Sequence, residues 1–136
     1  MTPRQKLLVR SSFARLAPVS ALVASGFYTR LFEMDPSLRL LFKVEMKVQE
    51  QKFMQMLTTI VASMDPLEEV IPVVWPMGKR HVGYGVRPEH YVTVGSALLE
   101  TLEAQLGADF CGEICEAWTA AYALLSLTMQ HAADTP

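Results

Sequence analysis

The sequence predicts an all-α fold, and three observations support this prediction. Apolar residues recur at spacings of three and four along several stretches, which is the period of an amphipathic helix. N-cap residues, prolines and glycines separate these stretches. No two alternating β-branched runs flank an Asn-Gly or Asp-Gly turn, so no β-hairpin is expected. With 136 residues, the chain is expected to form one domain over residues 1–136.

Caps and helix breakers define the expected helices in order. Thr2 and Gln5 form a capping box for a first helix that Pro18 ends. Asp35 ends the second helix and caps a short third one. The expected segments are residues 3–17, 19–33, 36–42, 45–64, 70–84 and 88–106, followed by a helix from Asp109 into a frayed tail.

The second half of the chain repeats these signals. Asp65 and Glu68 supply a cap and an acid in the first turn of the next segment, and Gly107 closes the segment before the last helix. Pro72 and Pro76 are expected to split their segment into two short pieces, because proline lacks an N–H and clashes inside a regular helix. About eight helices are therefore expected.

Composition excludes several classes of protein. Hydrophobic residues make up 51% of the chain and charged residues 19%, and the net charge is -2, so a nucleic-acid binder is not expected. The longest uncharged stretch, residues 16–29, is broken by Pro18 and Gly26, and the N-terminus lacks a signal-peptide core. A soluble, cytoplasmic protein without a membrane partner is expected. Cys111 and Cys115 lack a zinc or thioredoxin spacing and are interpreted as small buried thiols.

Three polar side chains fall on apolar helix faces. His81 shares a face with Val74 and Met77, and Tyr28 and Gln49 also interrupt apolar stripes. Each has an ordinary explanation on its own, since a buried histidine, phenol or amide can be hydrogen-bonded within a core. Three inward-pointing polar groups together suggest a site with an interior ligand.

The order and spacing of several short motifs resemble the globin family, specifically bacterial single-domain globins, the haem domain of flavohaemoglobins and vertebrate neuroglobin. The motifs cover nearly the whole chain. They are residues 26–32, 35–36, 41–42, 49, 52–54, 78–81, 88–91, 94–95, 98–99 and 117–122. The resemblance implies a globin fold with helices in a three-over-three arrangement around one haem b (iron protoporphyrin IX).

The resemblance also implies roles for individual residues. His81 matches the proximal histidine, which binds haem iron and whose other ring nitrogen is expected to donate to a carbonyl or carboxylate. Tyr28 and Gln49 match distal donors to a bound gas, and Phe53 faces the ligand where the family usually has leucine or valine. The implied haem-contacting set is Phe42, Lys52, Met77, His81, Val86, Tyr91, Val94 and Leu98.

Two departures from the flavohaemoglobin pattern change what is expected. In that family a tyrosine and a glutamate support the proximal histidine, but only Tyr91 has a match, because the acid position falls at about Ala133. The resemblance therefore implies that His81 is supported by an uncharged group and not by a carboxylate. The Phe53 ring either narrows the gas pocket by its bulk or swings aside from it, and the sequence leaves both alternatives open.

The other histidines and the tryptophans are interpreted as structural. His90 is expected near a helix cap and His131 on the surface of the C-terminal tail. Trp75 and Trp118 are interpreted as core or cofactor-edge packing.

Reversible binding of O2, CO and NO at ferrous haem is the leading expected function. The alternative is a nitric oxide dioxygenase that depends on an external reductase, because no glycine-rich flavin or nicotinamide fingerprint occurs in the chain. A gas sensor is a less favoured hypothesis, because a sensor normally needs an output domain in addition to the haem domain. A six-coordinate electron-transfer haem protein is the remaining hypothesis.

Overall fold

The computed structural model describes residues 1–64, 69–110 and 112–135, and all regular structure in these ranges is helical. This confirms the all-α prediction for the described residues. They contain six α-helices rather than about eight, joined by three short 3-10 segments. The α-helices are α1 (Pro3–Leu16), α2 (Ser20–Met34), α3 (Met46–Ala62), α4 (Val70–Gly83), α5 (Pro88–Leu106) and α6 (Glu113–Asp134). The 3-10 segments are η1 (Ala17–Val19), η2 (Pro36–Leu41) and η4 (Gly107–Asp109).

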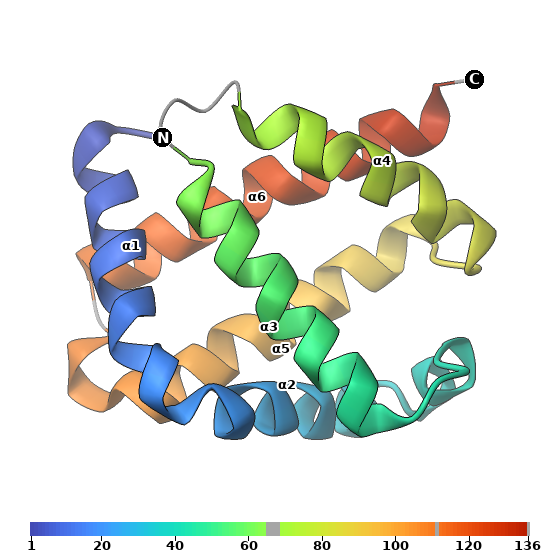
Figure 1. Cartoon of the computed structure of the whole chain (residues 1–136), viewed down its shortest axis with the longest axis horizontal. Helices are drawn as coiled ribbons and strands as arrows, with labels where there is room; N and C mark the ends of the chain where they lie inside the picture. Colours follow the sequence, from blue (N-terminus) through green and yellow to red (C-terminus); the bar gives the residue numbers. More distant parts are fainter. Residues whose placement is uncertain (65–68, 111, 136) are drawn as a thin grey trace.

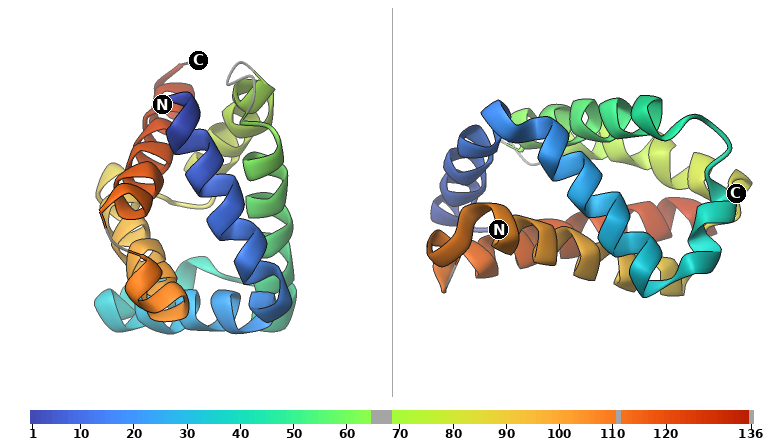
Figure 2. Two further views of the ribbon diagram at one scale, coloured as in Figure 1. Left: turned by 90° about the vertical axis from the view of Figure 1, so that its left-hand side faces the viewer. Right: turned by 90° about the horizontal axis from the view of Figure 1, so that it is seen from below.

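The helices form two crossed layers. Helices α3 and α4 lie on one side and α5 and α6 on the other, and α1 and α2 run between the two sides (Figures 1 and 2). The most extensive contacts join α4 to α6, α2 to α5 and α1 to α6. Only residues 42–45 separate η2 from α3.

One buried cluster fills the space between the layers, and every α-helix contributes to it. Val9, Val23 and Val74 are among its fully buried members. Among the described residues, no fully buried side-chain nitrogen or oxygen lacks a hydrogen-bond partner. The polar groups that the core contains are therefore paired, as the energetics of burial require.

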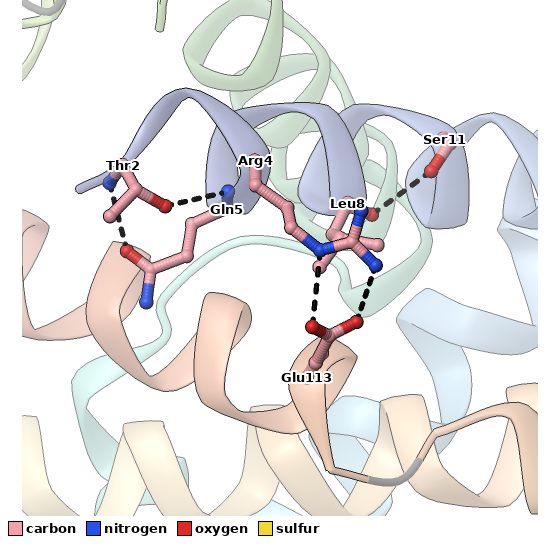
Figure 3. A network of polar contacts seen from close by, with 6 residues as sticks. All are labelled: Thr2, Arg4, Gln5, Leu8, Ser11 and Glu113. Atoms are coloured by element: carbon pink, nitrogen blue, oxygen red, sulfur yellow. Dashed lines mark hydrogen bonds and ion pairs between the residues drawn. The ribbon is translucent and has the colours of Figure 1, made fainter.

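The N-terminus is held to α6 as well as capped. Thr2 and Gln5 form the expected capping box. Arg4 donates from Nε and Nη2 to the two carboxylate oxygens of Glu113, at 3.1 and 2.5 Å (Figure 3). Both partners are exposed, so this bidentate pair contributes little stability but links the first turns of two helices that are distant in sequence.

The two prolines of α4 do not split it, and that expectation is wrong. Pro72 lies in the first turn, where its missing N–H would have no partner within the helix. Pro76 lies inside the helix, yet Val70–Gly83 remains continuous. Packing against α6 stabilises the helix enough to offset the bond that Pro76 cannot make.

The expected bounds of the last helix are also wrong. It begins at Glu113 rather than Asp109, because residues 107–109 form a 3-10 turn and Gly107 and Gly112 adopt positive φ angles of 61° and 48°. It continues to Asp134, so the first two residues of the expected frayed tail, 133 and 134, are helical, whereas Thr135 ends the helix in an extended conformation. His131 therefore lies on a helix, although it is exposed as expected. The expected cap at Asp65, Pro66 and Glu68 and the environment of Cys111 lie outside the described residues.

By length and composition alone, the stretch Pro3–Met34 could cross a membrane. Core helices of soluble proteins pass the same test, so this is weak evidence for a span. In the structure the 3-10 turn η1 divides the stretch into α1 and α2. Both halves contribute buried residues to the core, including Val9 and Phe27.

Candidate functional site

Tyr28 and Gln49 lie together between α2 and α3. The Gln49 Nε2 donates to the Tyr28 hydroxyl oxygen at 2.9 Å. Tyr28 is buried, with 5% of its surface exposed, and Gln49 is half-buried. Two polar groups that the sequence places 21 residues apart on apolar faces therefore form one pair.

The direction of this hydrogen bond leaves the phenol proton available. Because the amide donates to the Tyr28 oxygen, the Tyr28 O–H can donate to another acceptor. Burial raises the pKa of Tyr28 to about 12, while the Gln49 hydrogen bond lowers it and the negative charge of Glu50 raises it. The phenol therefore stays protonated near neutral pH and can serve as a donor.

An aromatic cluster surrounds this pair. The Phe53 ring stacks on Phe27, with centroids 4.3 Å apart and planes 9° from parallel, and it meets Tyr28 edge-on at 5.6 Å. Phe42 meets Tyr28 edge-on at 5.4 Å and Phe32 at 5.6 Å. The Phe53 ring is therefore turned toward α2, and whether it narrows a gas pocket stays a prediction. It does not separate Gln49 from Tyr28.

His81 lies in the last turn of α4. Its Nδ1 is 2.6 Å from the backbone carbonyl oxygen of Met77, one turn earlier, so Nδ1 carries the proton and Nε2 is the free nitrogen. Burial lowers the pKa of His81, the Met77 hydrogen bond raises it, and the nearby Arg80 charge lowers it. The ring lies 5.8 Å from that of Tyr84. The expected hydrogen bond from the second ring nitrogen to a carbonyl is present.

The arrangement around His81 fits a cofactor that contains a metal ion. A neutral imidazole with Nδ1–H held by a carbonyl presents Nε2 as a lone-pair donor in a set tautomer, which is how a haem-ligating histidine is oriented. Among the described residues, no group of three or more His, Cys, Asp or Glu side chains could hold a metal ion by itself. A single histidine suits a cofactor that brings its own equatorial ligands.

The remaining expected contact residues fall into three groups by burial. Met77, Tyr91 and Leu98 belong to the buried cluster, and Phe42, Val86 and Val94 are partly buried and pack against it. Lys52 differs from them, because it is exposed on α3, one turn beyond Gln49. The apolar members therefore lie in or against the one buried cluster, and Lys52 lies outside it.

The position at which flavohaemoglobins carry the supporting acid falls near the end of α6. Ala133 is half-buried in the last turn of α6 and carries no carboxylate. Tyr91 is instead approached through its backbone, since the Tyr122 hydroxyl donates to the Tyr91 carbonyl oxygen at 2.5 Å. A Cβ on Gly95 would lie 2.6 Å from the Tyr122 ring, so Gly95 makes room for this contact.

The structural interpretations hold for His90 and Trp118, whereas Trp75 lies outside the buried cluster and Cys115 is only half-buried. His90 accepts from the Arg87 backbone N–H at 2.9 Å, which is the expected cap-region role. Trp118 is buried and hydrogen-bonded to Ser12, and Trp75 is half-buried with its ring 5.3 Å from that of His131. Cys115 is a free, half-buried thiol.

Sequence reasoning missed the role of Gly78. A Cβ there would lie 2.4 Å from the Met129 carbonyl oxygen, so α4 and α6 touch backbone to backbone three residues before His81. A glycine inside an apolar helical pattern, next to a candidate ligand, is the signal that could have found it. The role of Ser12 was also missed. In this case the sequence carries no signal, because nothing near Ser12 marks it as the buried partner of a tryptophan 106 residues away.

The fold and this site define an all-α protein with a buried phenol paired to a half-buried amide, and a single histidine whose Nδ1 is held by a carbonyl. A globin family model matches residues 25–129, so the chain belongs to the globin family. The flavohemoproteins of Bordetella parapertussis and Bacillus subtilis are each 30% identical to it, over 93% and 88% of this chain. These matches are 32% and 31% of the two relatives, so the chain spans about a third of their length.

A solved structure shows the same fold. It is an engineered carbene transferase whose Rhodothermus marinus parent is described as a candidate nitric oxide dioxygenase. The TM-score is 0.87 at 26% identity, and the match covers 98% of this chain and 93% of that one. Globin membership implies haem binding.

Proposed function

We propose that this globin, acting as one domain of residues 1–136 in the cytoplasm, holds one haem b through His81 and binds O2, CO and NO reversibly. Ferrous haem supplies an iron that takes a diatomic gas on the face opposite its histidine ligand. The observation that carries the proposal is the half-buried His81 imidazole, whose Nδ1 is held by the Met77 carbonyl and whose Nε2 is free.

Tyr28 and Gln49 are proposed to hold the gas from the distal side. Tyr28 donates its free O–H, and Gln49 polarises that hydroxyl by donating to its oxygen. Phe53 and Phe42 keep water away from the pair, because their rings pack against Tyr28. The proposed haem-contacting set remains Phe42, Lys52, Met77, Val86, Tyr91, Val94 and Leu98, with Lys52 directed at a haem carboxylate.

On the proximal side, His81 is proposed to be a neutral ligand with modest electron donation. A carbonyl accepts from its Nδ1–H, and the residue at the expected acid position is Ala133. A carbonyl acceptor makes the imidazole less basic than a carboxylate would. This favours reversible gas binding over peroxide-type chemistry.

The second candidate function is nitric oxide dioxygenation with electrons from an external reductase. The names of the flavohemoprotein relatives and the description of the Rhodothermus parent favour it. The same distal pair would serve both functions, because each needs a held dioxygen. The two functions differ in their need for electrons. Dioxygenation requires the iron to be reduced again after each turnover, whereas reversible gas binding does not.

Two measurements test these proposals. The His81→Ala variant is expected to lose haem or to change the ferrous absorption spectrum, and an unaltered spectrum would remove His81 as the ligand. Stopped-flow O2 release is then compared with NO consumption in the presence of a generic flavin reductase. Slow release without sustained NO turnover supports oxygen storage or scavenging, whereas many turnovers per haem support the dioxygenase.

A further inference from the structure

At Gly78 the backbone of α4 lies directly against the backbone of α6. A Cβ built there would lie 2.4 Å from the carbonyl oxygen of Met129, 2.8 Å from its Cα and 2.9 Å from its carbonyl carbon. These are backbone atoms within a helix, so no side-chain rotation could relieve the overlap. Any larger residue at position 78 must move one helix away from the other.

Helix α4 depends on such outside support. Pro76 has no N–H to bond the carbonyl one turn earlier, which weakens the ladder of the helix ahead of His81. The C-terminal turns of α6 meet α4 on both sides of Gly78. Trp75 approaches His131, with ring centroids 5.3 Å apart, and Lys79 Nζ donates to the Thr135 carbonyl oxygen at 2.6 Å.

We propose that Gly78 is a positioning residue for His81, acting through its backbone contact with α6. The inference rests on the proposed ligation of haem by His81. His81 and the carbonyl that holds its Nδ1 both belong to α4 and lie within three residues of Gly78. A displacement of α4 at Gly78 therefore moves the imidazole and its anchor together, and changes the distance and tilt of Nε2 relative to the iron.

The test is Gly78→Ala, with Gly83→Ala as the matched control. Both glycines lie on α4, but a Cβ on Gly83 would meet nothing within 4 Å. The readouts are the ferrous iron–histidine stretching frequency and the rate of haem loss to a scavenger protein. We expect Gly78→Ala to shift the frequency and to speed haem loss on the order of 10- to 100-fold, as displaced outer-shell partners of a metal ligand do. Gly83→Ala is expected to match the wild type.

A detached ligand separates positioning from general loss of packing. In a His81→Gly background supplied with free imidazole, the ligand is no longer tethered to α4. There, Gly78→Ala is expected to leave the iron–imidazole frequency unchanged, and a shift as large as in the intact protein overturns the proposal. Equal frequencies for Gly78→Ala and Gly83→Ala in the intact protein overturn it too, while leaving the proposed function standing.

Two further outcomes distinguish failure of the proposed haem ligation from failure of the positioning role of Gly78. If His81→Gly leaves the ferrous spectrum unaltered, the proposed ligation fails and the positioning role fails with it. If Gly78→Ala does not fold, Lys79→Met removes a surface contact of the same helix pair, with the exposed Lys47→Met as the charge-matched control. Faster haem loss in Lys79→Met alone supports the proposal, and equal rates in the two variants contradict it.

Discussion

The indole N–H of Trp118 donates to the Ser12 hydroxyl oxygen over 2.8 Å, joining α6 to α1 in the core. Both residues are buried, and Ser12 also donates to the Leu8 and Val9 carbonyls of its own helix. This serine therefore satisfies a tryptophan that the core would otherwise leave without a partner.

Ser12→Ala is expected to lower the free energy of unfolding by about 1 to 3 kcal/mol, because it leaves the Trp118 N–H buried and unpaired. Urea unfolding followed by tryptophan fluorescence measures this. The neighbouring Ser11→Ala is the matched control, since Ser11 is exposed and bonds only the Leu8 carbonyl of its own turn. A loss in Ser12→Ala no larger than in Ser11→Ala would contradict the prediction.

Tyr28→Phe is expected to speed O2 release roughly 10- to 150-fold, the equivalent of ~1.5 to 3 kcal/mol for a hydrogen bond to a charged acceptor. Gln49→Leu is expected to have a smaller effect, because Gln49 donates to the Tyr28 hydroxyl and is proposed to act on the gas through it. Release of the less polar CO should change far less in both variants. Stopped-flow ligand replacement measures all of these rates.

The double variant tests whether the pair is one network. If Gln49 acts only through Tyr28, adding Gln49→Leu to Tyr28→Phe changes O2 release little further, so the two effects are not additive. Wild-type release rates in both single variants would rule out the distal assignment. They would favour a six-coordinate electron-transfer haem.

Gly95→Ala is expected to destabilise the protein by about 1 to 3 kcal/mol, because its Cβ would lie 2.6 Å from the Tyr122 ring and force that ring off the Tyr91 carbonyl. The control is Gly26→Ala. Its Cβ would come closest to the end of the flexible Arg30 side chain, at 2.9 Å, and would lie at ordinary van der Waals distance, 3.7 Å, from Thr101 Cγ2, so alanine's higher helix propensity should prevail there. Thermal unfolding of the two variants gives the comparison, and equal midpoints would contradict it.

Alkaline pH is expected to destabilise the fold through Tyr28. Its pKa is about 12 in the folded chain and ~10 when unfolded, so between these values the unfolded chain releases a proton that the native state keeps. The contribution of Tyr28 to the free energy of unfolding is therefore fully present below pH ~10. It falls as the pH rises, by about 1 to 1.5 kcal/mol at pH ~11. Tyr28→Phe should flatten the decline measured by urea unfolding. Because burial also raises the pKa of Tyr122, the variant should retain part of it.

Local signals in the sequence were enough to predict most helix bounds. The capping box of Thr2, the Asp35 cap and the closing Gly107 act within one turn of chain, so their effect is visible without the fold. Where bounds were wrong, a distant segment decided. Helix α4 continues through Pro76 because α6 packs along it, and propensity alone does not include that energy.

By itself, the sequence determined that the described chain is helical and that Tyr28, Gln49 and His81 interrupt apolar faces, because caps and periodicity are properties of neighbouring residues. Only the tertiary structure decided that Gln49 donates to Tyr28, that Phe53 stacks on Phe27, and that Gly78 lets α4 touch α6. These relationships join residues on different helices. They depend on how closely and at what angle the helices cross, which no local pattern specifies.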